Sequence, residues 1–222
     1  MNLKERATLK TVIAYILGLF FVSIGSATSI RSNLGSGPAV SISYTATLIL
    51  GINFGLTTFI WQCILLLIQF LILRKKFRLS MLFQLLAGFL ISYFNALGLI
   101  VVDLFPQPSS LPHRLLYVAL SAVIGGFGVW LYTSAGLINM PTEGLVKTVA
   151  DTTGIAFHRI KILYDVICVV SSGAICLIQL HTTGSVGIGT VIIAFALGMM
   201  VGVYRKHFRK TLEKIIGMPA AI

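Results

Sequence analysis

The sequence predicts an all-α membrane protein with six transmembrane helices, arranged as two inverted three-helix repeats that each carry a short broken or re-entrant half-helix (39–50 and 142–153). Three observations lead to this fold: a composition poor in charge, two helix breaks that contain proline, and a match of the chain with itself. We expect one membrane domain over 1–222, with repeats over about 11–104 and about 114–205.

The composition favours lipid over water as the surroundings of the chain. Of the 222 residues, 57% are hydrophobic and 10% are charged, whereas a soluble domain carries about 25% charged residues. The formal net charge of +11 would suggest nucleic acid on a soluble chain. Here the basic residues gather at the ends of apolar runs, where they set orientation in a membrane, so we expect no nucleic-acid partner.

The first break is the stretch Leu34-Gly35-Ser36-Gly37-Pro38. Glycine and proline interrupt a helix, and Pro38 suits the first turn of a new one. The helix that it opens would be about 12 residues, or ~18 Å, long, whereas a ~30 Å hydrocarbon core needs about 20 residues. This segment therefore reaches about the middle of a bilayer and stops at Gly51.

The second break, Asn139-Met140-Pro141, repeats this arrangement. It opens a second short helix, from Thr142 to Thr153, which stops at Gly154. A helix of this length is again too short to cross a bilayer.

Six longer apolar runs surround the short segments. They are Thr11–Ile30, Phe54–Leu73, Leu79–Leu104, Leu115–Ala135, Ile160–Leu180 and Ser185–Tyr204. The first run competes with a signal peptide as an interpretation, but it is longer than a usual signal core and more spans follow, so we expect it to be retained. Between the third and fourth runs, Pro106, Pro108 and Pro112 predict a loop that is not helical.

Glycines inside the later runs predict close helix packing. Gly125, Gly126 and Gly128 would let the fourth run approach a neighbouring helix. Gly198 and Gly202 have the GxxxG spacing, and we interpret them as packing residues too.

The basic residues predict the orientation. If both short segments enter and leave on the same side, the N-terminus, the Arg74–Arg78 turn, the Lys147–Lys161 region and the C-terminal tail all share one side. That side carries nearly all lysines and arginines and is therefore cytoplasmic. We expect a multi-pass protein of the bacterial cytoplasmic membrane with both termini and a basic tail (206–222) in the cytoplasm.

The internal repeat appears when the chain is moved against itself by 103 positions. Helix breakers then match in type and order, as do several other residues: Gly25 falls on Gly128, Pro38 on Pro141, Gly51 on Gly154, Trp61 on Tyr164 and Gln62 on Asp165. Because each half has an odd number of crossings, the second half must be inverted relative to the first, as in many transporters and channels.

The two short helices predict a site for a solute. Their first N–H groups carry partial positive charge. If Pro38 and Pro141 lie deep, an anionic or polar solute is favoured, and if they lie at the surfaces, a cation is favoured. The predicted substrate-binding residues are the polar and loop residues near the breaks: Arg31, Asn33, Ser36, Gly37, Ser41, Asn139, Thr142, Glu143, Lys147, Asp151 and Asp165.

Several of these residues have structural alternatives. Glu143, Lys147 and Asp151 share one face at helical spacing, which an ion-paired interfacial helix would also show. A charge such as Asp165 inside a span costs about 2.5–3.5 kcal/mol and so suggests function, but it could neutralise Arg159 or Lys161 instead. Arg31 could be an interfacial anchor, and the hydroxyl residues could bond to helix backbone.

Catalytic and metal chemistry are not expected. Cys63, Cys168 and Cys176 lie inside apolar segments and are odd in number, which favours small buried residues over disulfides or a metal site. The stretch Gly35-Ser36-Gly37 is similar to a serine-protease loop, but no histidine lies inside a span, and the carboxylates are too scattered for a metal. We expect no enzyme, no metal and no cofactor.

The chain resembles the YczE/YitT-like family of small bacterial integral membrane proteins. The resemblance covers about Thr11 to Tyr204 and depends on the Leu34–Pro38 break and on Gly187-Ile188-Gly189-Thr190, which leads to Gly198. The chain departs from it at Ala39 and Met199, where relatives would have an aromatic residue and a proline. The resemblance implies an integral membrane protein and a transporter, without naming a substrate.

We therefore predict a secondary transporter or channel for a small polar solute, with an anion as one option. The expected partners are membrane lipid and a small-molecule or ion substrate, and a homodimer is left open. Two alternatives are a substrate-binding subunit of a larger importer, which its size and six spans fit, and a regulatory or structural membrane protein without transport.

Overall fold

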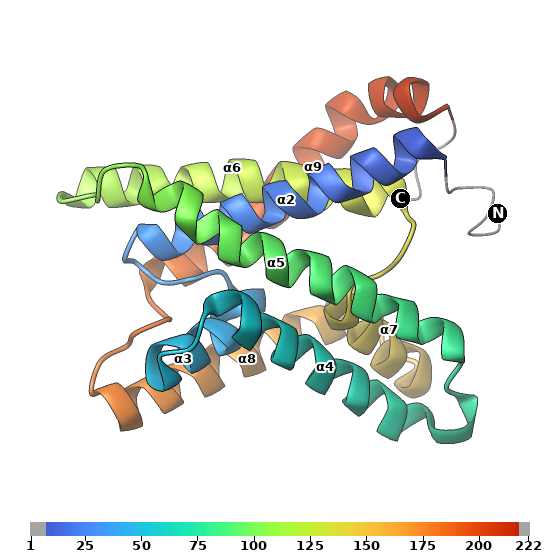
Figure 1. The fold of residues 1–222 in the computed structure, drawn as a ribbon, viewed down its shortest axis with the longest axis horizontal. Coiled ribbons are helices and arrows are strands. Elements are labelled where there is room, and N and C mark those ends of the chain that lie inside the picture. The colour runs from blue at the N-terminus through green and yellow to red at the C-terminus, as the bar shows by residue number, and fades with distance from the viewer. Residues whose placement is uncertain (1–7, 218–222) are drawn as a thin grey trace.

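The structure is a computed structural model that describes residues 8–217, all of them helical or in short links (Figure 1). The six predicted spans are confirmed as long helices apolar enough to cross a membrane. They are α2 (Leu9–Arg31), α4 (Phe54–Leu73), α5 (Gln84–Asp103), α6 (Leu111–Ala135), α8 (Phe157–Leu180) and α9 (Ile188–Ile216). The first residues of the predicted basic N-terminus and the end of the predicted tail lie outside the described range.

Two short helices occupy the predicted positions. A 3₁₀ turn, η1 (Pro38–Val40), continues directly into α3 (Ser41–Leu50), and α7 (Pro141–Thr153) begins at its own proline. Both helices end on a glycine in the left-handed region, Gly51 at φ 65° and Gly154 at φ 73°, where a glycine has no Cβ to oppose the turn.

The short helices lie on opposite sides of the centre of the molecule. Figure 1 shows α3 toward the left-hand end of the long helices and α7 toward the right-hand end. The right-hand end also holds the basic turn between α4 and α5, which consists of the 3₁₀ turns η2 (Arg74–Lys76) and η3 (Leu79–Phe83).

Helices α2 and α6 cross with their backbones very close together. A Cβ on Gly25 would lie 2.6 Å from the Cα of Gly125, and a Cβ on Gly128 would lie 2.4 Å from the backbone nitrogen of Val22. The backbones can approach this closely only because glycine lacks a side chain. The prediction that glycines of the fourth span allow close packing is confirmed.

The other helices surround this pair. α5 packs on α2 and α9 packs on α6, while α4 packs on α5 and α7, and α3 packs on α8. Large apolar side chains such as Leu71, Val170 and Phe195 are exposed on the outer helices. A surface of this kind suits lipid.

The link between α8 and α9 is fastened to the first break. The backbone N–H and the hydroxyl of Ser36 both donate to the Ser185 carbonyl, at 2.8 and 2.9 Å. The Gly189 N–H donates to the Leu34 carbonyl at 2.8 Å. A Cβ on Gly187 would lie 2.3 Å from that same carbonyl oxygen, so the contact requires glycine.

Three predictions need correction. α9 does not end at Tyr204 but continues through the predicted tail to Ile216, because no glycine or proline interrupts it before Gly217. Pro112 does not lie in a loop, since it occupies the first turn of α6, where proline is tolerated. Gly198 and Gly202 do not pack within residues 8–217, because a Cβ on either would meet nothing within 4 Å.

Candidate functional site

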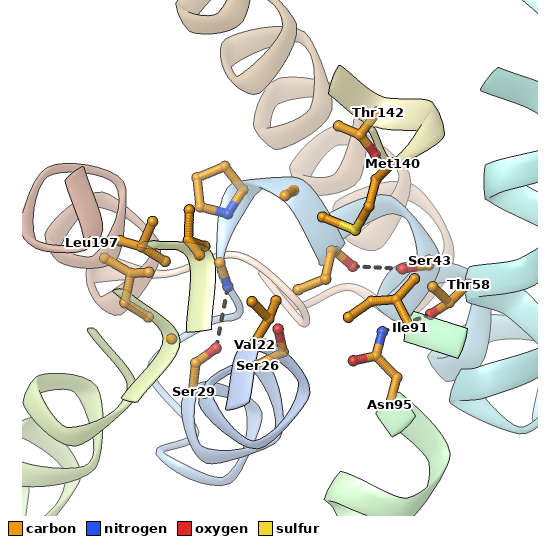
Figure 2. Close-up of a pocket in the computed structure, with 18 of the residues that line it drawn as sticks. Val22, Ser26, Ser29, Ser43, Thr58, Ile91, Asn95, Met140, Thr142 and Leu197 are labelled. Carbon is orange, nitrogen blue, oxygen red and sulfur yellow. Dashed lines mark hydrogen bonds between the residues drawn. The ribbon is translucent and has the colours of Figure 1, made fainter. Parts of the chain in front are cut away.

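A cavity of about 190 Å³ lies where the long helices meet (Figure 2). Every α-helix of residues 8–217 contributes at least one residue to its lining. Figure 2 shows Val22 and Ser29 of α2, Asn95 of α5 and Leu197 of α9 around it. Most of the lining is apolar, so each polar group that it contains is conspicuous.

The N-terminal ends of both short helices reach this cavity. Residues Gly37–Val40 line it from one side, and Met140, Thr142 and Glu143 line it from the other. Both proline-containing breaks therefore place helix N-termini, with their partial positive charge, at one buried place.

The two ends differ in the side chains that lie beside their backbone N–H groups. At α7, the Glu143 carboxylate accepts a hydrogen bond from the Met140 N–H at 3.1 Å and another from the Tyr132 hydroxyl. At η1, the Gly37 N–H donates to the Ser29 hydroxyl at 3.2 Å. The Ala39 N–H and the equivalent Thr142 N–H both have no hydrogen-bond partner within residues 8–217. The difference is that the Glu143 carboxylate lies at the α7 end, whereas the η1 end has no carboxylate in the described lining.

Two further charged residues of the lining come from α8. The Lys161 ammonium lies 2.5 Å from an Asp165 carboxylate oxygen, one helical turn away, and 5.5 Å from the centre of the Tyr164 ring. Both side chains of the ion pair are about two-thirds buried or more. The pair neutralises itself, so Glu143 gives the lining a formal charge of −1.

Amide side chains supply the remaining polarity. Asn95 is 1% exposed, and its Nδ2 donates to the Thr58 hydroxyl at 3.4 Å, while its Oδ1 has no partner in the described chain. Figure 2 shows this oxygen turned away from Thr58. On the other side, the Thr142 hydroxyl donates to Gln62 Oε1 at 3.4 Å.

Buried amides extend from the cavity between α4, α5 and α7. Gln69 Nε2 donates to Gln84 Oε1 at 3.2 Å and to the Pro141 carbonyl at 3.0 Å. Gly144 makes room for them, because a Cβ there would lie 2.2 Å from Gln84 Oε1. These bonds fix the start of α7 against its neighbours.

A second pocket of about 320 Å³ is lined mainly by residues from the C-terminal ends of α2 and α5 and from the segment that leads into α6. Arg31 and Asn33 line it, together with Asp103 and Arg114. Arg31 Nη1 lies 2.6 Å from Asp103 Oδ1, and Arg31 Nη2 donates to the Phe105 carbonyl at 3.0 Å. This pocket is polar, in contrast to the central cavity.

The structure divides the predicted site residues into four groups. The first group, Gly37, Thr142, Glu143 and Asp165, lines the central cavity, and the second, Arg31 and Asn33, lines the second pocket. The third group, Ser36 and Ser41, is buried, and both hydroxyls donate to backbone carbonyls. The fourth group, Asn139, Lys147 and Asp151, is exposed and lines neither pocket. Lys147 and Asp151 share a helix face with Glu143 but lie farther from the break.

Most residues of the cavity lining were not among the predicted site residues, and the missed ones that matter most for its polarity are Asn95, Lys161 and Tyr132. A lone amide inside an apolar run was a usable signal for Asn95. Lys161 stands one turn from Asp165, where an ion pair is expected. Nothing in the sequence singles out Tyr132. Within residues 8–217, no group of three or more histidine, cysteine or acidic side chains could hold a metal ion.

Comparison with known proteins places the chain in a bacterial context. The profile of a family described as "Family of unknown function (DUF6198)" matches residues 9–206. An uncharacterized protein of Haemophilus influenzae is 26% identical over 88% of this chain and 83% of its own length. The uncharacterized protein YyaS of Bacillus subtilis is 25% identical over 87% of this chain and 94% of its own. No solved structure gives a significant match.

Proposed function

We propose that this chain, which belongs to the DUF6198 family, carries a small polar solute across the bacterial cytoplasmic membrane as a secondary transporter or channel. One observation supports this most: the N-terminal ends of two helices too short to cross a membrane converge on one cavity among six long apolar helices. Unpaired backbone groups cost several kcal/mol in lipid and survive only where protein or a wet cavity satisfies them.

An inverted repeat accounts for the position of the cavity. At the offset of 103 found in the sequence, much of the lining falls into equivalent pairs: Val22/Gly125, Ser26/Val129, Ser29/Tyr132, Gly37/Met140, Ala39/Thr142, Val40/Glu143, Thr58/Lys161, Gln62/Asp165 and Ile91/Ala194. A cavity lined by equivalent residues is expected on the axis that relates two halves.

The contacts between the halves support the same symmetry. Gly25 lies against Gly125, and Gly128, the equivalent of Gly25, lies against Val22, the equivalent of Gly125. Trp61 Nε1 donates to the Tyr164 hydroxyl at 3.3 Å, and these two residues are themselves 103 positions apart. A two-fold relation requires such reciprocal contacts.

The short helices behave as re-entrant segments in this proposal. α3 and α7 have 10 and 13 residues, and they leave the cavity toward opposite ends of the molecule (Figure 1). The basic turn Arg74–Lys76 lies at the α7 end, which we assign to the cytoplasm because positive residues remain there.

Cysteine accessibility tests the proposal without knowledge of the solute. In a chain whose native cysteines are replaced by serine, Ser26→Cys places a thiol in the cavity lining. A pathway predicts that membrane-impermeant thiol reagents modify it from outside in cells and from inside in inverted vesicles. Val170→Cys is the control, because Val170 is 63% exposed on the outer face of α8 and would face lipid.

Two outcomes would count against a pathway. If Ser26→Cys is modified from neither side, the cavity is a closed part of the core. If it is modified from outside alone, the alternative of a substrate-binding subunit of a larger importer is favoured.

A further inference from the structure

We infer that the solute is a small zwitterion, whose carboxylate binds at the Gly37–Val40 end of the cavity and whose ammonium group binds near Glu143. This inference depends on the proposed function and specifies the class of its substrate. It follows from the unequal treatment of the two short-helix ends and from one unpartnered amide.

The η1 end is the anion-binding side of the cavity. The helix from Pro38 to Leu50 is more than three turns long, so the dipoles of its peptide groups give its N-terminus a partial positive charge. Its cap, Gly37, supplies no side chain, and the Ala39 N–H is unpartnered. Val40 stands where the second half has Glu143, so no carboxylate of residues 8–217 occupies this end.

The opposite side of the cavity is the cation-binding side. The Glu143 carboxylate occupies the α7 end, and with Lys161 paired to Asp165 the formal charge of the lining is −1. A simple anion would be repelled by Glu143. A simple cation would leave the η1 end unsatisfied. A solute with both charges complements both sides.

Asn95 is the second and independent observation. Its side chain is 1% exposed, it lines the cavity, and its Oδ1 lacks a partner in the described chain. A buried acceptor without a donor is costly, so a ligand that donates a hydrogen bond is favoured there.

The cavity size is compatible with such a solute. Its volume of about 190 Å³ leaves room for a small amino acid such as alanine or γ-aminobutyrate.

Binding to the purified protein in detergent tests the inference. Trp61 lines the cavity, whereas Trp130 is 4% exposed in the core, so we expect a ligand in the cavity to change mainly the emission of Trp61. The probes are the standard amino acids and γ-aminobutyrate. For each amino acid that binds, the matched amine, which lacks the carboxylate, and the matched carboxylate, which lacks the amine, are tested as well. For alanine these are ethylamine and propionate. We expect saturable binding of one or more amino acids, at least tenfold tighter than binding of either matched compound.

Two variants assign the contacts. Glu143→Gln should weaken binding of the positive amino acid at least tenfold. Lys147→Gln, one turn farther along α7 and exposed, should leave it unchanged. Asn95→Leu, which removes the open polar atom of the cavity, should also weaken binding. Thermal unfolding of all three variants checks that they fold.

Two results would overturn the inference. The first is that the matched amine or carboxylate binds as tightly as the amino acid or more tightly. The second is that no amino acid changes the fluorescence. If Ser26→Cys is still modified from both sides in that case, the pathway stands and only its substrate class is wrong.

Discussion

Helices α4 and α5 pack closely against each other, whereas α8 and α9 do not, although each pair follows a short helix in the chain. α4 packs along α5, and Gly55 of α4 lies so close that an added Cβ would be 2.6 Å from the Ser92 carbonyl. α8 and α9 make at most marginal contact with each other. Gly173 of α8 and Gly202 of α9 have no neighbour within 4 Å of an added Cβ.

The loosely packed pair, α8 and α9, belongs to the second half of the chain, which supplies the charged residues of the cavity lining. Glu143, Lys161 and Asp165 all come from α7 and α8, and their counterparts at the 103 offset are uncharged. Elements with few buried contacts open most easily. The first half of the chain is therefore the more rigid one, and the charged residues of the cavity belong to the half that can move more easily.

The largest expected effect tests the rigid crossing of α2 and α6. Gly128→Ala would place a Cβ 2.4 Å from Val22 N and 2.6 Å from the Gly18 carbonyl oxygen, both backbone atoms. We expect the free energy of unfolding to fall by about 3 kcal/mol. Gly202→Ala, with no neighbour, should raise it by up to about 1 kcal/mol through helix propensity. Unfolding in mixed micelles measures both, and equal effects would refute the close crossing.

The next largest effect concerns the ion pair of Lys161 and Asp165 in the second half, compared with the uncharged Gln62 at the equivalent position of the first half. Asp165→Asn leaves the Lys161 ammonium without its partner and should cost about 2 kcal/mol of unfolding free energy. Adding Lys161→Met should restore most of this loss. Gln62→Leu, the change at the equivalent position, should cost about 1 kcal/mol because Thr142 loses an acceptor. Additive losses in the double variant would show that the ion pair is not coupled.

A smaller effect tests the contact that joins the halves. Tyr164→Phe removes the hydroxyl that accepts the Trp61 N–H at 3.3 Å. We expect a loss of about 1 kcal/mol in unfolding free energy and a blue shift of Trp61 emission as its N–H loses a polar partner. Unchanged emission would argue against this bond.

The smallest effect concerns the ion pair outside the cavity. The Asp103 side chain is 64% exposed, so Asp103→Asn should cost less than about 1 kcal/mol. The loss should shrink further in high salt, because exposed charges are screened. A loss as large as that of Asp165→Asn would mean that the second pocket, not the cavity, holds the critical charge pair.

Local sequence signals predicted the elements better than the site. Proline at positions 38 and 141 and glycine at 51 and 154 act through their own backbone geometry, so the short helices begin and end where expected. The gathering of side chains depends on tertiary packing. Lys147 has the same spacing argument as Glu143 but is exposed, and Arg31 stands close to the break in sequence but faces another pocket.

The fastening of Leu34 and Ser36 to the α8–α9 link has a mechanical consequence. Because Ser36 is two residues before Pro38, a shift of Ser185 or Gly189 would pull on the tip of the short helix through hydrogen bonds of 2.8 Å. The link thus joins the facing ends of α8 and α9, which make little contact with each other, to the start of the short helix. A movement of α9 relative to α8 would therefore be passed on to the position of Pro38.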